Sequence, residues 1–182
     1  MFKEIMFSDY RKLIAKVDKF CEKGSDKYAD EIACKKGCAD CCNKILTFFP
    51  VEFFNIIEYI QLKNIDENII VDNIDSILAK ESKDCPLLHN DECMIYDARP
   101  VICRTFGLPA IVKDDVMETV DIQICDKNFL TEGLELENDY IINLDTLNSM
   151  LFIINSVFVK VYKGFAQGDD ARLSVLEIVN YI

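Results

Sequence analysis

The chain has a single histidine, no tryptophan, six glycines and four prolines among its 182 residues. With only His89 available, motifs that need two histidines, such as H-E-x-x-H or a His-based facial triad, are excluded. The glycines lie apart and form neither a G-x-G-x-x-G motif nor a phosphate-binding loop, so the sequence carries no nucleotide-binding signature. The modest proline and glycine content also argues against a disordered chain.

Basic residues are scarce relative to acidic ones. The sequence has 20 Lys and Arg against 32 Asp and Glu, which gives a net charge of −12 at pH 7 and a pI near 4.5. A surface that follows nucleic-acid phosphates or anionic lipids needs clustered cations. We therefore expect no nucleic-acid partner and no membrane partner.

Long hydrophobic runs are missing as well. Residues 1–9 contain no extended apolar segment and no small-residue cleavage site of the kind found in secretory signals. The uncharged run from Thr146 to Val159 is shorter than the roughly 20 residues that span a bilayer, and Asp145 and Lys160 bracket it. Together these absences predict a cytoplasmic protein.

Cysteine, in contrast, is abundant, with nine residues in the chain. In the reducing cytoplasm, thiols at short spacings are explained more simply by metal than by disulfides. The first block, Cys34-Lys35-Lys36-Gly37-Cys38-Ala39-Asp40-Cys41-Cys42, brings four thiols into one loop. A second block runs from Cys85 through Cys93 to Cys103, and Cys125 follows it. This pattern predicts a metal site.

Thiolates are soft ligands, and cysteines separated by two or three residues can converge on one ion, as in four-cysteine zinc sites and iron–sulfur centres. The predicted ligands are Cys34, Cys38, Cys41, Cys42, Cys85, Cys93, Cys103 and Cys125. Eight thiols suit two four-sulfur sites, one cluster plus one ion, or one multinuclear site, and zinc and iron–sulfur fit them equally well. Because adjacent side chains usually diverge, we expect Cys41 and Cys42 to face different ions or to bridge them. Cys21, beside Phe20, is predicted to be a buried core thiol instead.

Other residues of the second block are expected to support the metal site. Arg99 and Arg104 flank Cys103, where their cationic groups can offset the negative charge of a thiolate-ligated centre. The alternative for both is an ion pair with one of the abundant acids. Tyr96 is expected either to brace the block through its hydroxyl or to pack as an ordinary aromatic residue. His89 is expected on an exposed turn and not on a metal.

Helical periodicity dominates the rest of the chain. The expected helices cover about residues 8–33 with a break at Gly24-Ser25, 50–60, 64–80, 137–165 as the longest element, and 169–181. The segments Ile111–Val112 and Val116–Ile124 alternate around a polar turn, which is typical of a β-hairpin. The predicted fold class is therefore mainly α: a single-domain irregular helical bundle over residues 1–182, with a loop-rich cysteine cluster at about 34–125 and room for one small β-hairpin. A homodimer seam along the expected helix at 137–165 is the alternative to a central core helix.

These cysteine blocks resemble the YkgJ-like cysteine-cluster family, whose members are described as zinc- or iron-chelating and sometimes as iron–sulfur proteins. The resemblance covers Cys34 to Cys125 and rests on Cys38-Ala39-Asp40-Cys41-Cys42, on Cys85-Pro86-Leu87 and on the run from Cys93 to Phe106. The family's shorthand has two residues between its first cysteines, whereas three separate Cys34 from Cys38. The resemblance implies metal binding by eight cysteines and does not imply a reaction.

The leading hypothesis is a cytoplasmic protein that holds zinc or iron, including an iron–sulfur cluster, in a structural, redox or sensing role. An enzymatic alternative comes from the spacing of Cys34, Cys38 and Cys41, which is similar to the three-cysteine loop of radical S-adenosylmethionine enzymes; flagellin lysine N-methylases are similar to the family in this block. Against it, the chain is short for a barrel and lacks alternating strand–helix units. A metal chaperone or store is the other alternative. No sequence feature names a protein partner.

Overall fold

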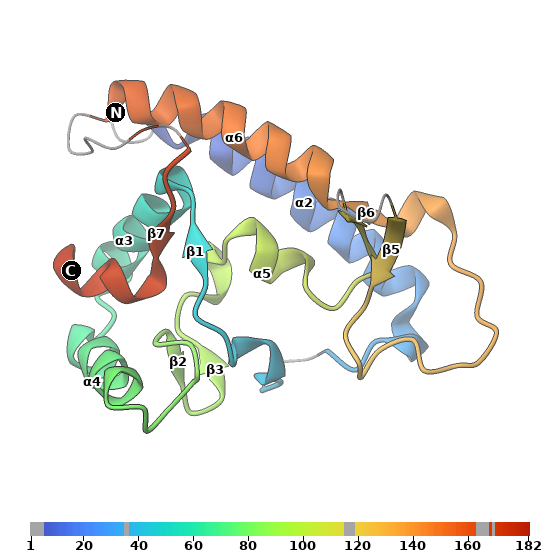
Figure 1. Cartoon of the computed structure of the whole chain (residues 1–182), viewed down its shortest axis with the longest axis horizontal. Coiled ribbons are helices and arrows are strands. Elements are labelled where there is room, and N and C mark those ends of the chain that lie inside the picture. Colours follow the sequence, from blue (N-terminus) through green and yellow to red (C-terminus); the bar gives the residue numbers. More distant parts are fainter. Residues whose placement is uncertain (1–5, 35–36, 115–118, 163–167, 169) are drawn as a thin grey trace.

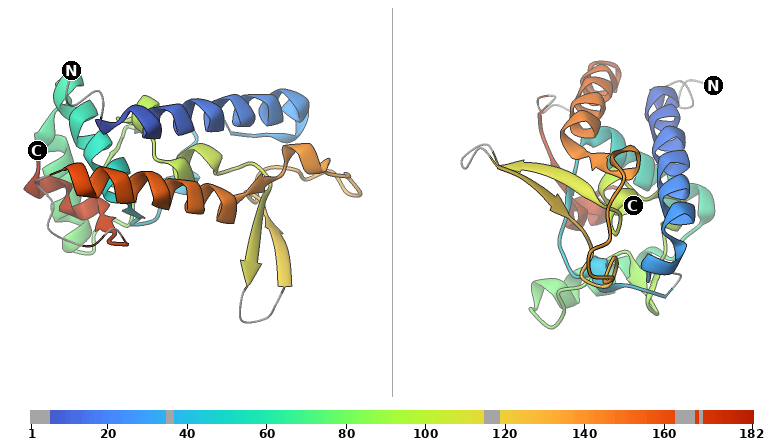
Figure 2. Two further views of the ribbon diagram at one scale, coloured as in Figure 1. Left: turned by 90° about the horizontal axis from the view of Figure 1, so that it is seen from above. Right: turned by 90° about the vertical axis from the view of Figure 1, so that its right-hand side faces the viewer.

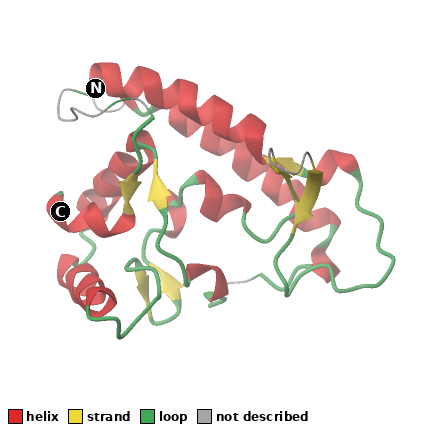
Figure 3. Cartoon of the chain, viewed as in Figure 1, coloured by secondary structure: helices red, strands yellow, loops and turns green. Residues whose placement is uncertain are grey.

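The structure, a computed structural model, describes residues 6–34, 37–114, 119–162, 168 and 170–182 (Figure 1). Helices dominate these residues, and the strands between them are short (Figure 3). The mainly α fold class predicted from the sequence is confirmed. Assignment to a single domain stays a prediction.

Two long helices form the upper frame of the molecule. α2 spans Ser8–Lys27 and α6 spans Leu144–Val161, and the two run alongside each other in opposite directions (Figures 1 and 2). The expected break at Gly24-Ser25 is wrong, because α2 continues through it. Gly24 is buried, and a Cβ there would lie 3.5 Å from the side chain of Leu108. Close packing therefore explains this glycine better than a helix end does.

Two shorter helices lie where the sequence predicted them, although α4 begins three residues after its expected start at residue 64. α3 covers Pro50–Lys63 with the proline in its first turn, and α4 covers Glu67–Leu78. The carboxylate of Asp66 caps α4 by accepting a hydrogen bond from the Asn68 amide at 3.0 Å. α3 is buried on several sides, and α4 only along a narrow stripe, so α3 is the more central of the two.

α6 begins later than the expected start at residue 137. Asn138–Tyr140 form a 3-10 turn and Ile142–Asn143 form strand β6 before it. The Asn143 side chain then caps α6 by accepting from the Thr146 amide at 2.9 Å. At 18 residues α6 is shorter than α2, which has 20, so the expectation that it is the longest element is wrong. Residues 163–165 of the expected helix lie outside the described residues.

α6 is apolar on two faces. One face buries Leu151 and Phe158, and the other exposes Met150, Ile153 and Val157 to solvent. By length and composition α6 is long and apolar enough to cross a membrane, although its uncharged run was expected to be too short. Core helices of soluble proteins pass the same test, but only 17% of this segment is buried.

The α-helix predicted over residues 169–181 is wrong, because this segment forms a short strand and a 3-10 helix. Strand β7, Leu173–Ser174, is followed by a 3-10 helix over Val175–Asn180. The Ser174 hydroxyl accepts from the Leu176 amide at 3.2 Å, while Glu177 accepts from the Ser174 amide at 2.6 Å. This capping box fixes the start of the 3-10 helix at Val175, six residues after the expected start at residue 169, which itself lies outside the described residues.

The strands form three small sheets. β1, Thr47–Phe48, pairs antiparallel with β7, and β2, Leu88–His89, pairs antiparallel with β3, Glu92–Cys93. β4, Ala110–Asp114, and β5, Thr119–Gln123, form the antiparallel hairpin that the sequence predicted, and β4 also pairs with β6 in parallel. The hairpin projects from the body of the molecule (Figure 2). Residues 115–118 at its turn lie outside the described residues.

Two apolar clusters hold these elements together. The larger one is centred on α3 and includes Phe53, Ile56 and Ile60, and the smaller one consists of Leu108, Ala110 and Ile142. Cys21 packs against both clusters, and burial raises the pKa of its thiol to about 11. Cys21 therefore lies at the edge of the core and is partly buried, whereas the sequence predicted a buried core thiol.

Candidate metal centre

Cysteines from both blocks line one cavity of about 640 Å³, which we call the cysteine pocket. Its cysteines are Cys38, Cys41, Cys42, Cys85, Cys93 and Cys103. Its other walls are mostly apolar, with the Arg99 side chain as a nearby cation. Residues more than 40 positions apart in the sequence are thus gathered around a single space.

A 3-10 turn over Asp40–Cys42 presents the first block to this pocket. The turn is closed by the Cys42 amide, which donates to the Ala39 carbonyl at 2.8 Å. The Cys42 thiol hydrogen-bonds to the Cys41 sulfur; this lowers the pKa of Cys41 to about 6 and raises that of Cys42. Both residues line the cysteine pocket together with four further cysteines. That the two face different ions or bridge them stays a prediction.

The second block reaches the pocket through three local structures. The turn after Cys85 leads into the β2–β3 hairpin, which places Cys93 opposite Leu88. The short helix α5, Val101–Thr105, carries Cys103. Burial raises the pKa of Cys85 to about 11 and raises that of Cys103, where the neighbouring charges of Cys85 and Cys93 add to the effect. These thiols are therefore mutual neighbours as well as pocket lining.

Cys34 and Cys125 lie beside the cysteine pocket and not in its lining. The pKa of Cys34 is raised by burial and lowered by a hydrogen bond from Asn128, and the charges of Cys125, Cys38 and Cys41 raise it further. The electrostatic neighbours of Cys42 are instead Cys41, Cys85 and Cys93. We call Cys34, Cys38 and Cys125 the outer cysteines and Cys42, Cys85, Cys93 and Cys103 the inner cysteines. Cys41 is a neighbour of both groups.

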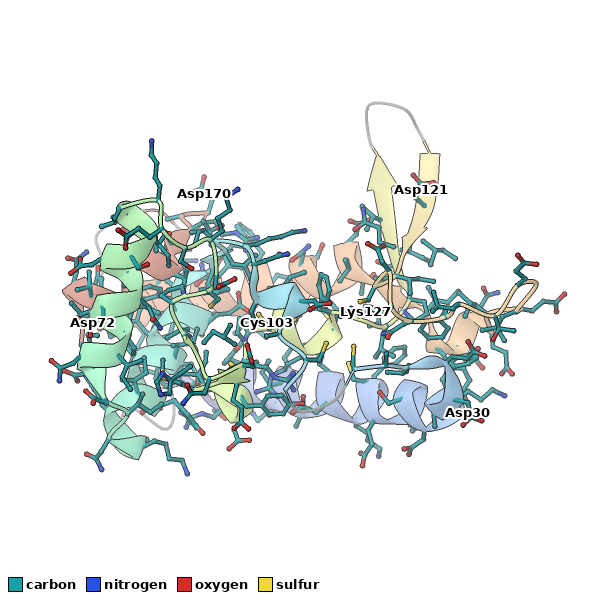
Figure 4. All side chains as sticks on the ribbon, turned by 90° about the horizontal axis from the view of Figure 1, so that it is seen from below. Asp30, Asp72, Cys103, Asp121, Lys127 and Asp170 are labelled. Atoms are coloured by element: carbon teal, nitrogen blue, oxygen red, sulfur yellow. The ribbon has the colours of Figure 1, made fainter. Side chains whose placement is uncertain are left out.

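An ion pair ties the outer cysteines together on the surface. Lys127, two residues after Cys125, pairs with Asp40, which lies between Cys38 and Cys41. Figure 4 shows Cys103 and Lys127 in the same central region of the molecule. The segment after β5 is thereby held against the first cysteine block.

Of the two arginines predicted to support the site, one lines the pocket and the other forms an ion pair elsewhere. Arg99 lines the pocket, stacks over the Tyr96 ring at 3.5 Å and donates to the Tyr96 carbonyl at 2.9 Å. Arg104 instead takes up the ion-pair alternative, since its Nη1 donates to both carboxylate oxygens of Asp18 at 2.7 and 2.9 Å. His89, in β2, is exposed as expected.

The donor set fits zinc or iron in its chemistry, because soft sulfur atoms from both blocks converge beside a cation that offsets thiolate charge. In the part of the chain that the structure describes, no three histidine, cysteine, aspartate or glutamate side chains stand close enough to hold one ion as they are. Zinc–sulfur bonds are about 2.3 Å long.

The sequence did not point to Asn128 or Gly107. Asn128 is 3% exposed, and its Nδ2 donates to the Cys34 sulfur at 3.3 Å and to the Gly107 carbonyl at 2.7 Å. Its Oδ1 accepts from the Ala33 amide at 2.9 Å. Only its position three residues after Cys125 hints at a role, and that is too weak a signal to single out one asparagine.

Comparison with known families matches residues 33–126 to the CxxCxxCC family, whose description is "Putative zinc- or iron-chelating domain". No curated protein and no solved structure gave a significant match. The family description supports metal binding in general, and it supports neither the methylase-related enzyme nor the chaperone alternative. The match covers just over half of the 182 residues and contains all of the second block. The chain therefore belongs to the CxxCxxCC family.

Proposed function

We propose that this chain is a cytoplasmic metal-binding protein that holds zinc or iron through the eight predicted cysteines. The observation that carries the proposal is the cysteine pocket, in which six thiols from two sequence blocks surround one cavity. The six thiols are partly buried, and several thiols gathered around one cavity are typical of sites for soft metal ions.

The grouping of the sulfurs favours two adjacent centres. Cys42 and Cys103 have Cys85 and Cys93 as neighbours, and Cys34 has Cys38 and Cys125. Cys38 also lines the cysteine pocket, and Cys41 is a neighbour of both sets. A sulfur in this position is suited to bridging two ions or to joining either group. Metal bound here would stabilise the geometry of both blocks and, as iron or an iron–sulfur cluster, would add redox capacity.

Arg99 is the residue most suited to balance the charge of the inner cysteines. It lines the pocket and lowers the pKa of Cys93 against the dominant effect of burial, which raises it. Its guanidinium is held in place by the Tyr96 ring and carbonyl. A fixed cation beside several thiolates reduces their mutual repulsion, which favours the loaded state.

Serine variants of one inner and one outer cysteine test the proposal. Cys103→Ser and Cys125→Ser each remove one sulfur, and Cys21→Ser is the matched control because Cys21 packs against the apolar clusters. All variants are purified without oxygen, and zinc and iron per chain are measured by elemental analysis. We expect both site variants to lose metal and the control to keep it. Folded site variants that retain the full wild-type metal content would contradict the proposal.

A further inference from the structure

We infer that Asn128 is a positioning residue for the outer cysteines, because its carboxamide holds the Cys34 sulfur in place and donates an N–H group to it. The inference rests on the proposed function, since it takes Cys34 to be a metal ligand. It adds a residue that lies beyond the part of the chain matched to the family, which ends at residue 126.

The carboxamide of Asn128 is buried and uses both of its ends. Oδ1 accepts from the Ala33 amide at 2.9 Å, so Nδ2 must face the Cys34 sulfur at 3.3 Å and the Gly107 carbonyl at 2.7 Å. As a thiol, Cys34 also approaches Oδ1, at 3.8 Å. The N–H donor is the nearer of the two amide ends to the sulfur. The side chain is thus oriented to present a donor to Cys34.

Gly107 also lies close to the Cys34 sulfur. Its φ of +101° is in the region that favours glycine, and a Cβ there would lie 2.8 Å from the Cys34 sulfur and 3.2 Å from Asn128 Nδ2. The backbone therefore approaches the sulfur more closely than any other residue type would allow. Cys34 is an exposed residue, but its sulfur is contacted by the Asn128 carboxamide and lies close to Gly107.

Asn128 also links two ligands that the chain itself keeps far apart. Its backbone amide donates to the Cys125 carbonyl at 2.9 Å, while its side chain binds residues 33, 34 and 107. Within the first block, short spacings alone bring the thiols together. Cys34 and Cys125 are far apart in the sequence, and Asn128 connects them through its side chain and its backbone amide. Hydrogen bonds of this kind orient ligands and tune the metal that they hold.

The test compares Asn128→Asp with Asn148→Asp. Aspartate at 128 keeps the shape and the acceptor for the Ala33 amide but loses both N–H donors, whereas Asn148 is exposed on α6 and serves as the charge-matched control. Cobalt(II) is the probe, and its release to a chelator and its sulfur-to-metal absorption band are measured without oxygen. We expect Asn128→Asp to release part of its cobalt roughly 10–100 times faster and to shift the band. The control should match wild type.

A second pair of variants tests the position of the Cys34 sulfur by adding a methyl group beside it. Gly107→Ala places a methyl group against Cys34, while Gly133→Ala is the matched control, because Gly133 also has a positive φ, +76°, but no atom within 4 Å of the added carbon. We expect fast cobalt release from Gly107→Ala only. Wild-type release rates and band positions in both Asn128→Asp and Gly107→Ala would overturn the inference while leaving the proposed function intact. A folded wild-type chain that binds no cobalt, zinc or iron would instead overturn the proposed function, and this inference with it.

Discussion

The backbone carbonyl of Cys42 accepts a hydrogen bond from the amide of Cys85 at 2.5 Å, which joins the two cysteine blocks without any metal. Helices α2, α3 and α6 supply much of the main apolar core, whose buried members are aliphatic and aromatic residues. The scaffold therefore has its own source of stability, in contrast to small zinc fingers, which unfold when the metal is removed.

Metal removal should leave the helices folded. We expect that chelation under reducing conditions preserves the far-UV circular dichroism of the chain and lowers its Tm, because metal binds the folded state only. The two signals are recorded on the same sample before and after chelation. Collapse of the helical signal on chelation would show that the cysteines, and not the apolar core, hold the fold.

Asn155 should be important for stability. Its side chain is 0% exposed in the middle of α6, and its Oδ1 accepts from the Val51 amide at the start of α3 at 3.0 Å. Asn155→Ala leaves a buried donor unsatisfied, which costs about 1–3 kcal/mol in the free energy of unfolding. Asn148→Ala on the exposed side of the same helix is the control and should change stability little. Equal urea midpoints for the two variants would refute this role.

The stability of the protein should depend on pH through Glu52. Burial raises its pKa from the usual 4.5 to about 7, although the Val101 and Phe49 amides donate hydrogen bonds to its carboxylate. A raised pKa means that the stabilisation is complete below about 4.5 and is lost as the pH rises through about 7. The Glu52→Gln variant, which stays neutral, should therefore gain on the order of 3 kcal/mol relative to wild type between about pH 5 and about pH 8.

Urea unfolding of the metal-free, reduced wild type and Glu52→Gln at each pH measures this difference. Working with the difference between the two proteins removes the contribution of the cysteines, which titrate in both. A difference in unfolding free energy that stays constant across this pH range would mean that Glu52 does not carry the dependence.

Arg104 should support the fold and not the metal. Its side chain is 7% exposed, its Nη1 binds Asp18 in α2, and its Nε donates to the Arg99 carbonyl at 2.6 Å. Lysine cannot reproduce this fork, so Arg104→Lys should lower the free energy of unfolding by about 1–3 kcal/mol while leaving metal per chain unchanged. Arg11→Lys, at a more exposed ion pair with Glu58, is the control. Loss of metal from a folded Arg104→Lys protein would instead favour a role at the site.

Local signals in the sequence were sufficient for part of the fold. A proline in the first turn and an aspartate at the N-cap are sequence signals for a helix start, and Pro50 and Asp66 occupy these positions in α3 and α4. Alternation of apolar and polar residues predicts the β4–β5 hairpin. All three signals depend only on residues close together in the chain. The helix break predicted at Gly24 was wrong, because this glycine is explained by close packing against Leu108, which is distant in the sequence. The start of α6 was missed because β6 pairs with β4, which lies about 30 residues earlier in the sequence.

The candidate site shows the same division. Spacing identified the cysteines, since soft-metal ligands occur in short repeats. It did not divide them into inner and outer groups, because that division depends on how α5 and the segment after β5 fold back on the first block. Asn128 was missed for the same reason: its partners at residues 33, 34 and 107 meet only in three dimensions.

The most direct test of metal binding by these cysteines is elemental analysis of the wild-type chain purified without oxygen, read together with its absorption spectrum. We predict zinc or iron in stoichiometric amount: a colourless protein if the metal is zinc, and a brown one with broad visible absorption if it is held as an iron–sulfur cluster. A folded chain that contains neither metal would contradict the account.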